Sequence, residues 1–180
     1  MPTRLRKFSK IKEVFDKYDR SFLEKGSLPL HPTDAGFWGS SNIDIIYDFF
    51  FEIGLEKYKN FLDLGSGDGR VVLVASVFTK ATGFELDKEL FDKGVEVRDK
   101  LGLKANFFKK DYLSDSVDFG DYNFIFTYPD KRFSPEFEKK LKKELKGKLY
   151  VYNSIYFPYF LKKGKTWWVN QYPIIEYTRN

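Results

Sequence analysis

Hydrophobic residues recur along this chain in two different periods, one typical of helices and one typical of strands. The first apolar stripe advances by three or four residues at a time and so lies on one face of a basic helix: Phe8, Ile11, Phe15, Tyr18 and Phe22. From residue 61 onwards, short apolar runs alternate with helical periods. Strands are expected at 61–64, 81–84, 105–108, 122–126 and 149–152, with helices between the first three strands and before the last.

This alternation predicts an α/β fold in which right-handed crossovers build a mainly parallel sheet covered by helices on both faces. The pattern changes near the end, where apolar runs at 166–169 and 174–178 flank Asn170-Gln-Tyr-Pro173. Those two runs predict a hairpin that closes one edge of the sheet. Together with the five earlier strands they give a doubly wound, seven-stranded sheet.

The segment before this core is different in character. Residues 25–40 hold glycine and proline at short intervals, which favours a loop. Ser41 or Asn42 can cap a second helix that runs through residue 51. At 180 residues the chain has room for one compact domain. We therefore divide it into an N-terminal basic helix and lid loop, residues 1–41, and a single compact unit, residues 42–180.

The composition excludes several kinds of site. With no cysteine and one histidine, His31, the chain offers no disulfide framework and no thiolate or multi-histidine metal site, and no metal is expected. No stretch approaches the roughly 20 apolar residues that cross a bilayer, and the first residues lack the apolar run of a signal peptide. We expect a cytoplasmic protein that does not enter membranes. The sequence does not specify its oligomeric state.

The charge is unevenly distributed along the chain. Residues 1–20 carry seven basic and three acidic side chains, residues 42–130 carry eleven and seventeen, and residues 131–148 carry eight and three. Basic ends around an acidic centre are typical of a protein that attracts a polyanion or an acidic protein surface. The alternative is a solvated, lysine-rich face. A macromolecular partner, protein or nucleic acid, is therefore the expectation.

The chemistry concentrates in Phe61-Leu-Asp-Leu-Gly-Ser-Gly-Asp-Gly-Arg70. A buried strand delivers Asp63 to its carboxyl end, and Gly65, Gly67 and Gly69 allow a tight turn on which a ligand can lie directly against the backbone. Twenty residues after Gly65, Glu85 ends the next strand. A carboxylate at that place is suited to hold two ribose hydroxyls, so the segment predicts an adenosine-bearing cofactor.

The glycine spacing distinguishes between such cofactors. A dinucleotide fingerprint reads G-x-G-x-x-G, whereas this turn reads G-x-G-x-G, with Asp63 and Asp68 where a pyrophosphate would sit. S-adenosylmethionine, which has no phosphate and a cationic sulfonium, fits that charge. These residues resemble the class I S-adenosylmethionine-dependent methyltransferases, and the resemblance covers roughly Asn42 to Ser154. The resemblance implies a Rossmann-like sheet with its last strand antiparallel.

The same resemblance implies roles for individual residues. The methionine part would lie against Asp63 and the 65–69 turn, and the ribose against Glu85. Asp111 would accept the adenine amino group with Tyr112 against the ring, although a helix cap or turn is the alternative for Asp111. The cofactor site as a whole is expected to comprise ten residues: Asp63, Gly65, Ser66, Gly67, Gly69, Glu85, Leu86, Asp111, Tyr112 and Thr127.

The methyl acceptor is expected after the fourth strand, at Thr127-Tyr128-Pro129-Asp130. Methyltransferases that act on exocyclic amines often place Asn or Asp, two prolines and an aromatic residue here, and this chain lacks the leading amide or acid and one proline. Tyr128 and Pro129 are expected to shape an acceptor slot, with Asp130 taking a proton or orienting an amine. The alternative is a turn in which Asp130 caps the next helix.

The lid loop contributes two aromatic residues, Phe37 and Trp38. They are expected to cover the adenosine or to stack on a flat acceptor, or else to anchor the loop by hydrophobic contact. Both interpretations are compatible with a segment that immediately precedes the core.

A narrower resemblance concerns the acceptor. Gly83-x-Glu85, Asp111-x-Leu-Ser114 and Phe133-x-Pro-Glu136 are similar to blocks of the Dot-type histone-lysine methyltransferases and of small archaeal protein-lysine methyltransferases. That likeness implies methyl transfer to a protein lysine. An RNA or DNA base amine is the alternative acceptor, a non-catalytic S-adenosylmethionine-binding module is the alternative function, and a nucleotide-binding oxidoreductase is a more distant one.

Overall fold

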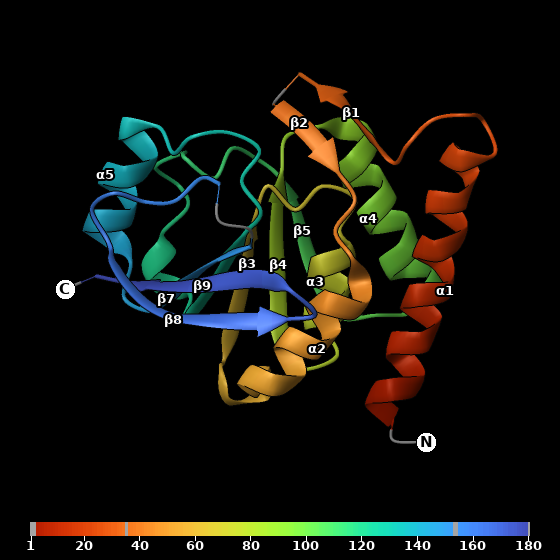
Figure 1. Cartoon of the computed structure of the whole chain (residues 1–180), viewed down its shortest axis with the longest axis horizontal. Coiled ribbons are helices and arrows are strands. Elements are labelled where there is room, and N and C mark those ends of the chain that lie inside the picture. The colour runs from red at the N-terminus through yellow and green to blue at the C-terminus, as the bar shows by residue number, and fades with distance from the viewer. Residues whose placement is uncertain (1–2, 35, 153–154, 180) are drawn as a thin grey trace.

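A single seven-stranded sheet forms the centre of the computed structural model, which describes residues 3–34, 36–152 and 155–179 (Figure 1). Its strand order is β5-β4-β3-β6-β7-β9-β8. The first five strands of the chain in this sheet are parallel: β3 (Asn60–Leu64), β4 (Lys80–Glu85), β5 (Ala105–Lys109), β6 (Phe124–Thr127) and β7 (Lys148–Tyr152). The last strand, β9 (Tyr172–Thr178), lies antiparallel between β7 and β8 (Lys162–Val169). The predicted α/β fold and seven-stranded sheet are confirmed.

Helices cover both faces of this sheet, unequally. Three of them lie on one face, α2 (Ile43–Ile53), α3 (Arg70–Ala75) and α4 (Lys88–Leu101), and α1 (Thr3–Leu23) packs against these three helices from outside. The other face carries α5 (Pro135–Glu144) and the short 3₁₀ turn η2 (Phe119–Asp121). A second 3₁₀ turn, η1 (Leu55–Lys57), follows α2. Two hydrophobic cores result, one under each layer, because alternate residues of a strand point to opposite faces.

The N-terminal helix belongs to the larger core. Phe8, Ile11 and Phe15 of α1 are buried in it, as the apolar stripe predicts. Of the two candidate cap residues for α2, Ser41 and Asn42, the cap is Asn42. Its side chain accepts hydrogen bonds from the amides of Asp44 and Ile45. The division of the chain at residue 41 stays a prediction.

The interpretation of residues 25–40 as a loop is wrong in part. They contain a two-stranded antiparallel hairpin formed by β1 (Leu30–Thr33) and β2 (Gly36–Gly39). Its strands have four residues each and include Pro32, so they show neither the length nor the alternation by which a strand is recognised in sequence. A proline is tolerated here because β1 pairs with β2 alone in the described sheet.

Two strand boundaries also differ from expectation. The strand expected at 122–126 begins later, at Phe124, because the amide of Tyr122 closes η2 on the Phe119 carbonyl. The final hairpin is longer than expected, and its turn consists of Asn170 and Gln171, which adopt positive φ angles of 44° and 72°. Two consecutive residues of this kind are typical of a tight hairpin turn.

Candidate active site

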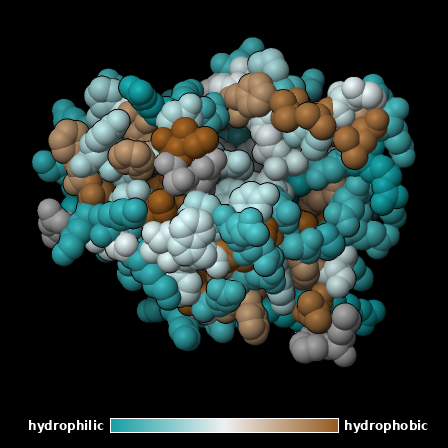
Figure 2. Space-filling view, viewed as in Figure 1, coloured by the Kyte–Doolittle hydropathy of each residue, from teal (hydrophilic) through white to brown (hydrophobic). Residues whose placement is uncertain are grey.

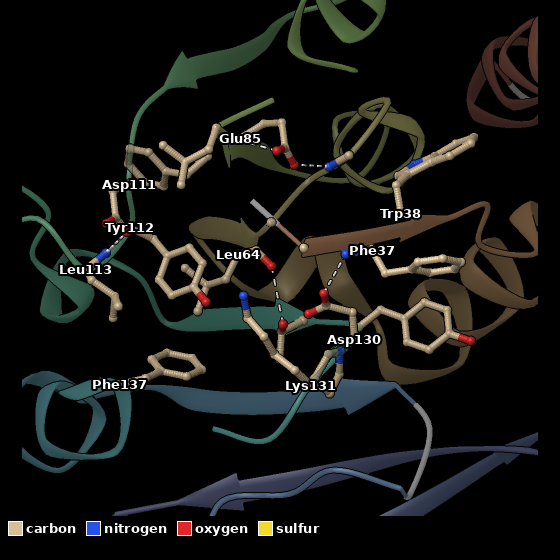
Figure 3. A pocket seen from close by; sticks show the side chains of 18 of the residues that line it. Phe37, Trp38, Leu64, Glu85, Asp111, Tyr112, Leu113, Asp130, Lys131 and Phe137 are labelled. Carbon is tan, nitrogen blue, oxygen red and sulfur yellow. Dashed lines mark hydrogen bonds between the residues drawn. The ribbon is translucent and has the colours of Figure 1, made fainter. Parts of the chain in front are cut away.

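The carboxyl ends of β3, β4, β5 and β6 meet at one edge of the sheet, and two adjoining cavities open there (Figure 3). Their volumes are about 330 and 430 Å³, within the range of about 300–1,000 Å³ common for small-molecule sites. The cavity lined by Glu85, Asp111 and Tyr112 is called cavity 1, and the cavity lined by Asp63 and Arg70 is called cavity 2. Both are lined by Phe37, Trp38, Gly65, Gly67, Tyr128, Pro129 and Asp130.

Four backbone amides of the glycine turn between β3 and α3, those of Gly65, Ser66, Gly67 and Gly69, donate within the protein. The amides of Gly65 and Ser66 donate to the Phe84 carbonyl at 3.1 and 2.9 Å, and that of Gly69 to the Ser66 carbonyl at 2.9 Å. The amide of Gly67 donates to the Glu85 carboxylate at 2.7 Å. A phosphate-binding turn offers such amides to its ligand. The engaged donors of this turn therefore do not form a phosphate cradle.

Gly67 and Gly69 are required by close packing as well as by their left-handed backbone. A Cβ atom on Gly67 would lie 2.7 Å from the indole of Trp38, and one on Gly69 would lie 2.7 Å from the ring of Phe107. Both have positive φ, 54° and 81°. At Gly65, by contrast, a Cβ atom would meet no atom within 4 Å, so the backbone there faces open cavity.

Glu85 is held rigidly at the end of β4. One carboxylate oxygen accepts the Gly67 amide, and the other accepts the amides of Leu86 and Asp87, both at 2.8 Å. The residue is 8% exposed, and its remaining surface lines cavity 1. A carboxylate offers about four lone-pair sites, and these amides occupy three, so the oxygen that accepts the Gly67 amide can still accept one hydroxyl donor in the cavity.

Asp63 is a deeply buried acid at the end of β3. It is 3% exposed and lines cavity 2. Burial raises the pKa of its carboxyl well above the ordinary value, and the negative charges of Glu85 and Asp68 raise it further. A cation bound in cavity 2 would relieve both effects, which suits a ligand that carries an ammonium or sulfonium group.

The Asp63 side chain predicts an unusual dependence of stability on pH. Because its folded-state pKa lies above its unfolded-state pKa, it contributes stability at low pH that is lost as pH rises through the folded value. Asp63→Asn is therefore expected to be more stable than the parent near neutral pH, with a difference that shrinks towards about pH 4, the unfolded pKa of aspartate. Thermal unfolding between acid and neutral pH checks this. A difference independent of pH would contradict it.

Asp68 does not face the ligand, contrary to the sequence argument about a pyrophosphate. Its carboxylate accepts two hydrogen bonds from Nε of Arg70 and one from Nη2, between 2.7 and 3.1 Å. It also accepts the backbone amide of Arg70, the first residue of α3, at 3.2 Å. Asp68 lines cavity 2 with its charge paired to Arg70, so Asp63 and Glu85 are the buried acids of the cavities outside this ion pair.

At the far end of cavity 1, Asp111 and Tyr112 lie side by side after β5 (Figure 3). Asp111 is exposed, and its carboxylate accepts the amide of Leu113 at 2.8 Å, which is a turn contact. Burial raises the pKa of Tyr112 to about 12, and its ring packs 5.2 Å from that of Phe137. Leu86 completes an apolar wall, 45% exposed. A flat, uncharged ring fits between such groups.

The turn after β6 brings four of the expected residues together. Thr127 is buried, and its hydroxyl donates to the Leu64 carbonyl at 3.2 Å, which ties β6 to β3. Tyr128 is 42% exposed, and its ring meets that of Tyr152 at 4.6 Å. Pro129 lies between Tyr128 and Asp130 on the wall shared by both cavities.

Asp130 fastens the β1–β2 hairpin to this turn. Its carboxylate accepts the Phe37 amide at 2.7 Å (Figure 3) and lies where a Cβ atom on Gly36 would be, 2.3 Å from the nearer oxygen. Sequence reasoning missed this contact, which joins residues 93 positions apart. Asp130 does not cap α5, whose first turn is capped by Ser134.

The two lid aromatics have different surroundings. Trp38 is 7% exposed and packs among Tyr18, Phe22 and His31, with Gly67 beneath it. Phe37 is 51% exposed and lines both cavities. The contacts of Trp38 are those of an anchor, whereas Phe37 has a free ring surface beside the cavities.

Comparisons with known proteins bear on the fold. No family model and no curated protein matches the sequence. Solved structures do match: an RNA methyltransferase from Salinibacter ruber in complex with S-adenosyl-L-homocysteine has a TM-score of 0.62 and 19% identity over 77% of this chain and 92% of its own. The putative methyltransferase yhhF from Escherichia coli has a TM-score of 0.60 and 18% identity, over 79% and 88% of the two chains. The chain has the methyltransferase fold.

A third match extends the range of that fold's chemistry. Magnesium protoporphyrin IX methyltransferase from Synechocystis PCC 6803, with bound SAM, has a TM-score of 0.59 and 12% identity over 77% of this chain and 78% of its own. These proteins act on different substrates, so the likeness does not support the Dot-type or archaeal protein-lysine subtype. The functional roles of the residues described above stay predictions.

Some residues of the cavities were not expected from sequence. Phe133 and Phe137 line cavity 1, and Leu28, Pro29 and Leu30 line cavity 2. Phe133 and Phe137 lie on either side of the Ser134 cap of α5, and this spacing was the sequence signal that could have placed them together. Among the described residues there is no group of three or more His, Asp or Glu side chains placed to hold a metal ion. In the same residues, no helix has both the length and the apolar character needed to cross a membrane.

Proposed function

We propose that this protein is an S-adenosylmethionine-dependent methyltransferase that acts on an amine. The observation that supports this most directly is the distribution of donors and charges around the glycine turn. Its amides donate within the protein, while two buried carboxylates, Asp63 and Glu85, line the cavities. A nucleoside without phosphates and with a positive charge fits these groups.

The cofactor residues divide between the two cavities. In cavity 1, Glu85 would hold a ribose hydroxyl, and Asp111 with Tyr112 and Leu86 would hold the adenine. In cavity 2, Asp63 with Ser66 would face the methionine part. The hydroxyl of Ser66 is buried beside Gly83 and has no hydrogen-bond partner among the described residues.

When bound, S-adenosylmethionine supplies an electrophilic methyl group on a sulfonium. The chain's own contribution is position and exclusion of water. Phe37 and Tyr128 border both cavities and are half exposed, so an acceptor entering between them meets two aromatic rings. Their apolar surface would disfavour the charged form of a lysine amine and keep it nucleophilic, whereas the exocyclic amine of a base is already neutral and needs only to be positioned there. Asp130 holds the hairpin that carries Phe37 against this slot.

The acceptor class follows from charge. From residue 131 onwards the chain carries twelve basic and four acidic side chains, and this part begins directly after the acceptor turn. A lysine in a basic protein segment would approach a surface of its own sign, whereas a nucleic acid would be attracted. We therefore favour a nucleic-acid base amine over a protein lysine.

Binding of the cofactor tests the first part. Glu85→Ala is expected to weaken S-adenosylmethionine and S-adenosylhomocysteine binding by about 1.5–3 kcal/mol, the scale of hydrogen bonds to a charged group. Isothermal calorimetry measures the loss, with thermal unfolding to verify that the variant is folded. Glu89→Ala, an exposed acid in the first turn of α4, is the matched control and should bind as the parent does. Unchanged affinity in folded Glu85→Ala would remove this residue from the site.

Transfer of labelled methyl groups tests the rest. The protein is incubated with radiolabelled S-adenosylmethionine and fractionated cell extract, and the product is treated with nuclease or with protease. Release of the label by nuclease alone supports a base acceptor, and release by protease alone supports a protein lysine. Tight cofactor binding without any labelled product would favour a non-catalytic binding module.

A further inference from the structure

The connection between β7 and β8 exposes three aromatic rings beside the candidate active site. Phe157, Tyr159 and Phe160 are 44%, 66% and 65% exposed. The rings of Phe157 and Tyr159 lie 5.5 Å apart at 55° to each other. Large aromatic surfaces that gather outside the core are typical of a binding surface. We name these three residues the aromatic patch.

The backbone beneath the aromatic patch is fixed by a buried acid. Glu138 of α5 is 3% exposed, and its carboxylate accepts the amides of Tyr159 at 2.7 Å and Phe160 at 3.5 Å. Leu161, next in the chain, is buried in the core under α5. The outward direction of the rings is therefore built into the fold, and little conformational entropy is lost when they bind a partner.

Cations of α5 surround the patch. The Lys142 ammonium lies 5.6 Å from the centre of the Phe160 ring, and Lys139 and Lys143 are exposed on the same helix. In Figure 2 brown and tan surface is interspersed with teal on the side of the molecule where Figure 1 places α5. Aromatic rings among positive charges match a chain of stacked bases and phosphates.

Chain neighbours of this surface border the cavities, although its own three rings line neither of them. On one side β7 ends at Tyr152, whose ring contacts that of Tyr128. On the other side, Phe137 in the first turn of α5 lines cavity 1, one residue before Glu138. A strand lying on the aromatic patch would therefore run towards the acceptor slot.

We propose that the aromatic patch, with Lys142, binds a single-stranded nucleic acid whose target base enters the slot at Tyr128. This rests on the proposed function only for the fate of that base; the binding surface is argued from the patch itself. An apolar peptide would match the rings and leave the lysines unpaired. A second copy of the chain would bring like charges together.

Fluorescence anisotropy with labelled single-stranded RNA and DNA oligonucleotides tests the proposal. Phe160→Ala and Tyr159→Ala are each expected to weaken binding by about 5-fold to 100-fold, the range for loss of one base–aromatic stack. Lys142→Gln is expected to weaken binding. The slope of log affinity against log salt concentration should become shallower by the amount that about one phosphate contact contributes. Phe51→Ala, which removes a ring 63% exposed on α2, is the control and should leave binding unchanged.

The results separate this proposal from the proposed function. The proposed binding surface is contradicted if the parent protein binds neither oligonucleotide at low salt. It is also contradicted if the patch variants bind as tightly as the parent. Preferential binding of an acidic peptide, lost in the same variants, would also overturn it. Calorimetry with S-adenosylmethionine is done in parallel. If the protein binds oligonucleotide through the patch but does not bind the cofactor, the proposed binding surface is supported and the proposed methyltransferase function is contradicted.

Discussion

Replacing Arg70 with methionine is expected to lower the free energy of unfolding by about 3–5 kcal/mol, the cost of leaving a buried charge without its partner. Arg70 is 3% exposed and Asp68 is 1% exposed. The guanidinium also donates to both carboxylate oxygens of Asp19, at 2.7 and 2.9 Å, and to the Ser41 carbonyl at 3.2 Å. Urea denaturation measures the loss.

Two further variants give this prediction its control. Arg98→Met removes an exposed ion pair with Asp99 and is expected to cost no more than about 1 kcal/mol. Replacing Asp68 and Arg70 together, by leucine and methionine, removes both buried charges and is expected to be less costly than Arg70→Met alone. A loss below about 1 kcal/mol in Arg70→Met would contradict the prediction, because exposed pairs already account for that much.

The same contacts give α1 a place in the site. Asp19 belongs to α1, and Arg70 begins α3 directly after the glycine turn, so their ion pair joins the N-terminal helix to that turn. Loss of the pair is expected to loosen the turn as well as the helix. Cofactor affinity in Arg70→Met should therefore fall together with stability.

The elements that could be predicted from sequence are those with a local cause. The five parallel strands are short apolar runs bounded by turn residues, and the glycine turn is specified by positive φ at Gly65, Gly67 and Gly69. Glu85 was placed at a strand end by its distance from that turn. Each of these depends on residues near one another in the chain.

What could not be predicted depends on contacts between distant residues. The Arg70 guanidinium donates to Asp68, two residues away, and also to Asp19, 51 positions before Arg70. The role of Asp130 depends on Phe37 across the fold. Trp38 became an anchor because Gly67 leaves room for its indole and α1 supplies two more rings. A single sequence holds no local pattern for such pairs.

Tyr128→Ala is expected to lower the rate of methyl transfer by about a hundredfold while S-adenosylmethionine affinity stays close to that of the parent, because an acceptor displaced by about 1 Å loses roughly that factor. Tyr128 lines both cavities, and its ring is supported from behind by Tyr152. We expect it to position the acceptor, because the cofactor contacts proposed above are made by other side chains, chiefly Asp63, Glu85 and Asp111. Single-turnover transfer and calorimetry, done on the same preparation, separate the two effects.

The matched control is Tyr172→Ala. Tyr172 lies on the other side of Tyr152, with ring centres 6.1 Å apart, is 49% exposed and lines neither cavity. It should transfer methyl groups at the parent rate. Tyr128→Phe keeps the ring and loses the hydroxyl, so a rate near that of the parent would assign the effect to the aromatic surface. If Tyr128→Ala itself transfers at the parent rate, the acceptor is positioned elsewhere, and Phe37, the other half-exposed ring shared by the two cavities, becomes the residue to replace.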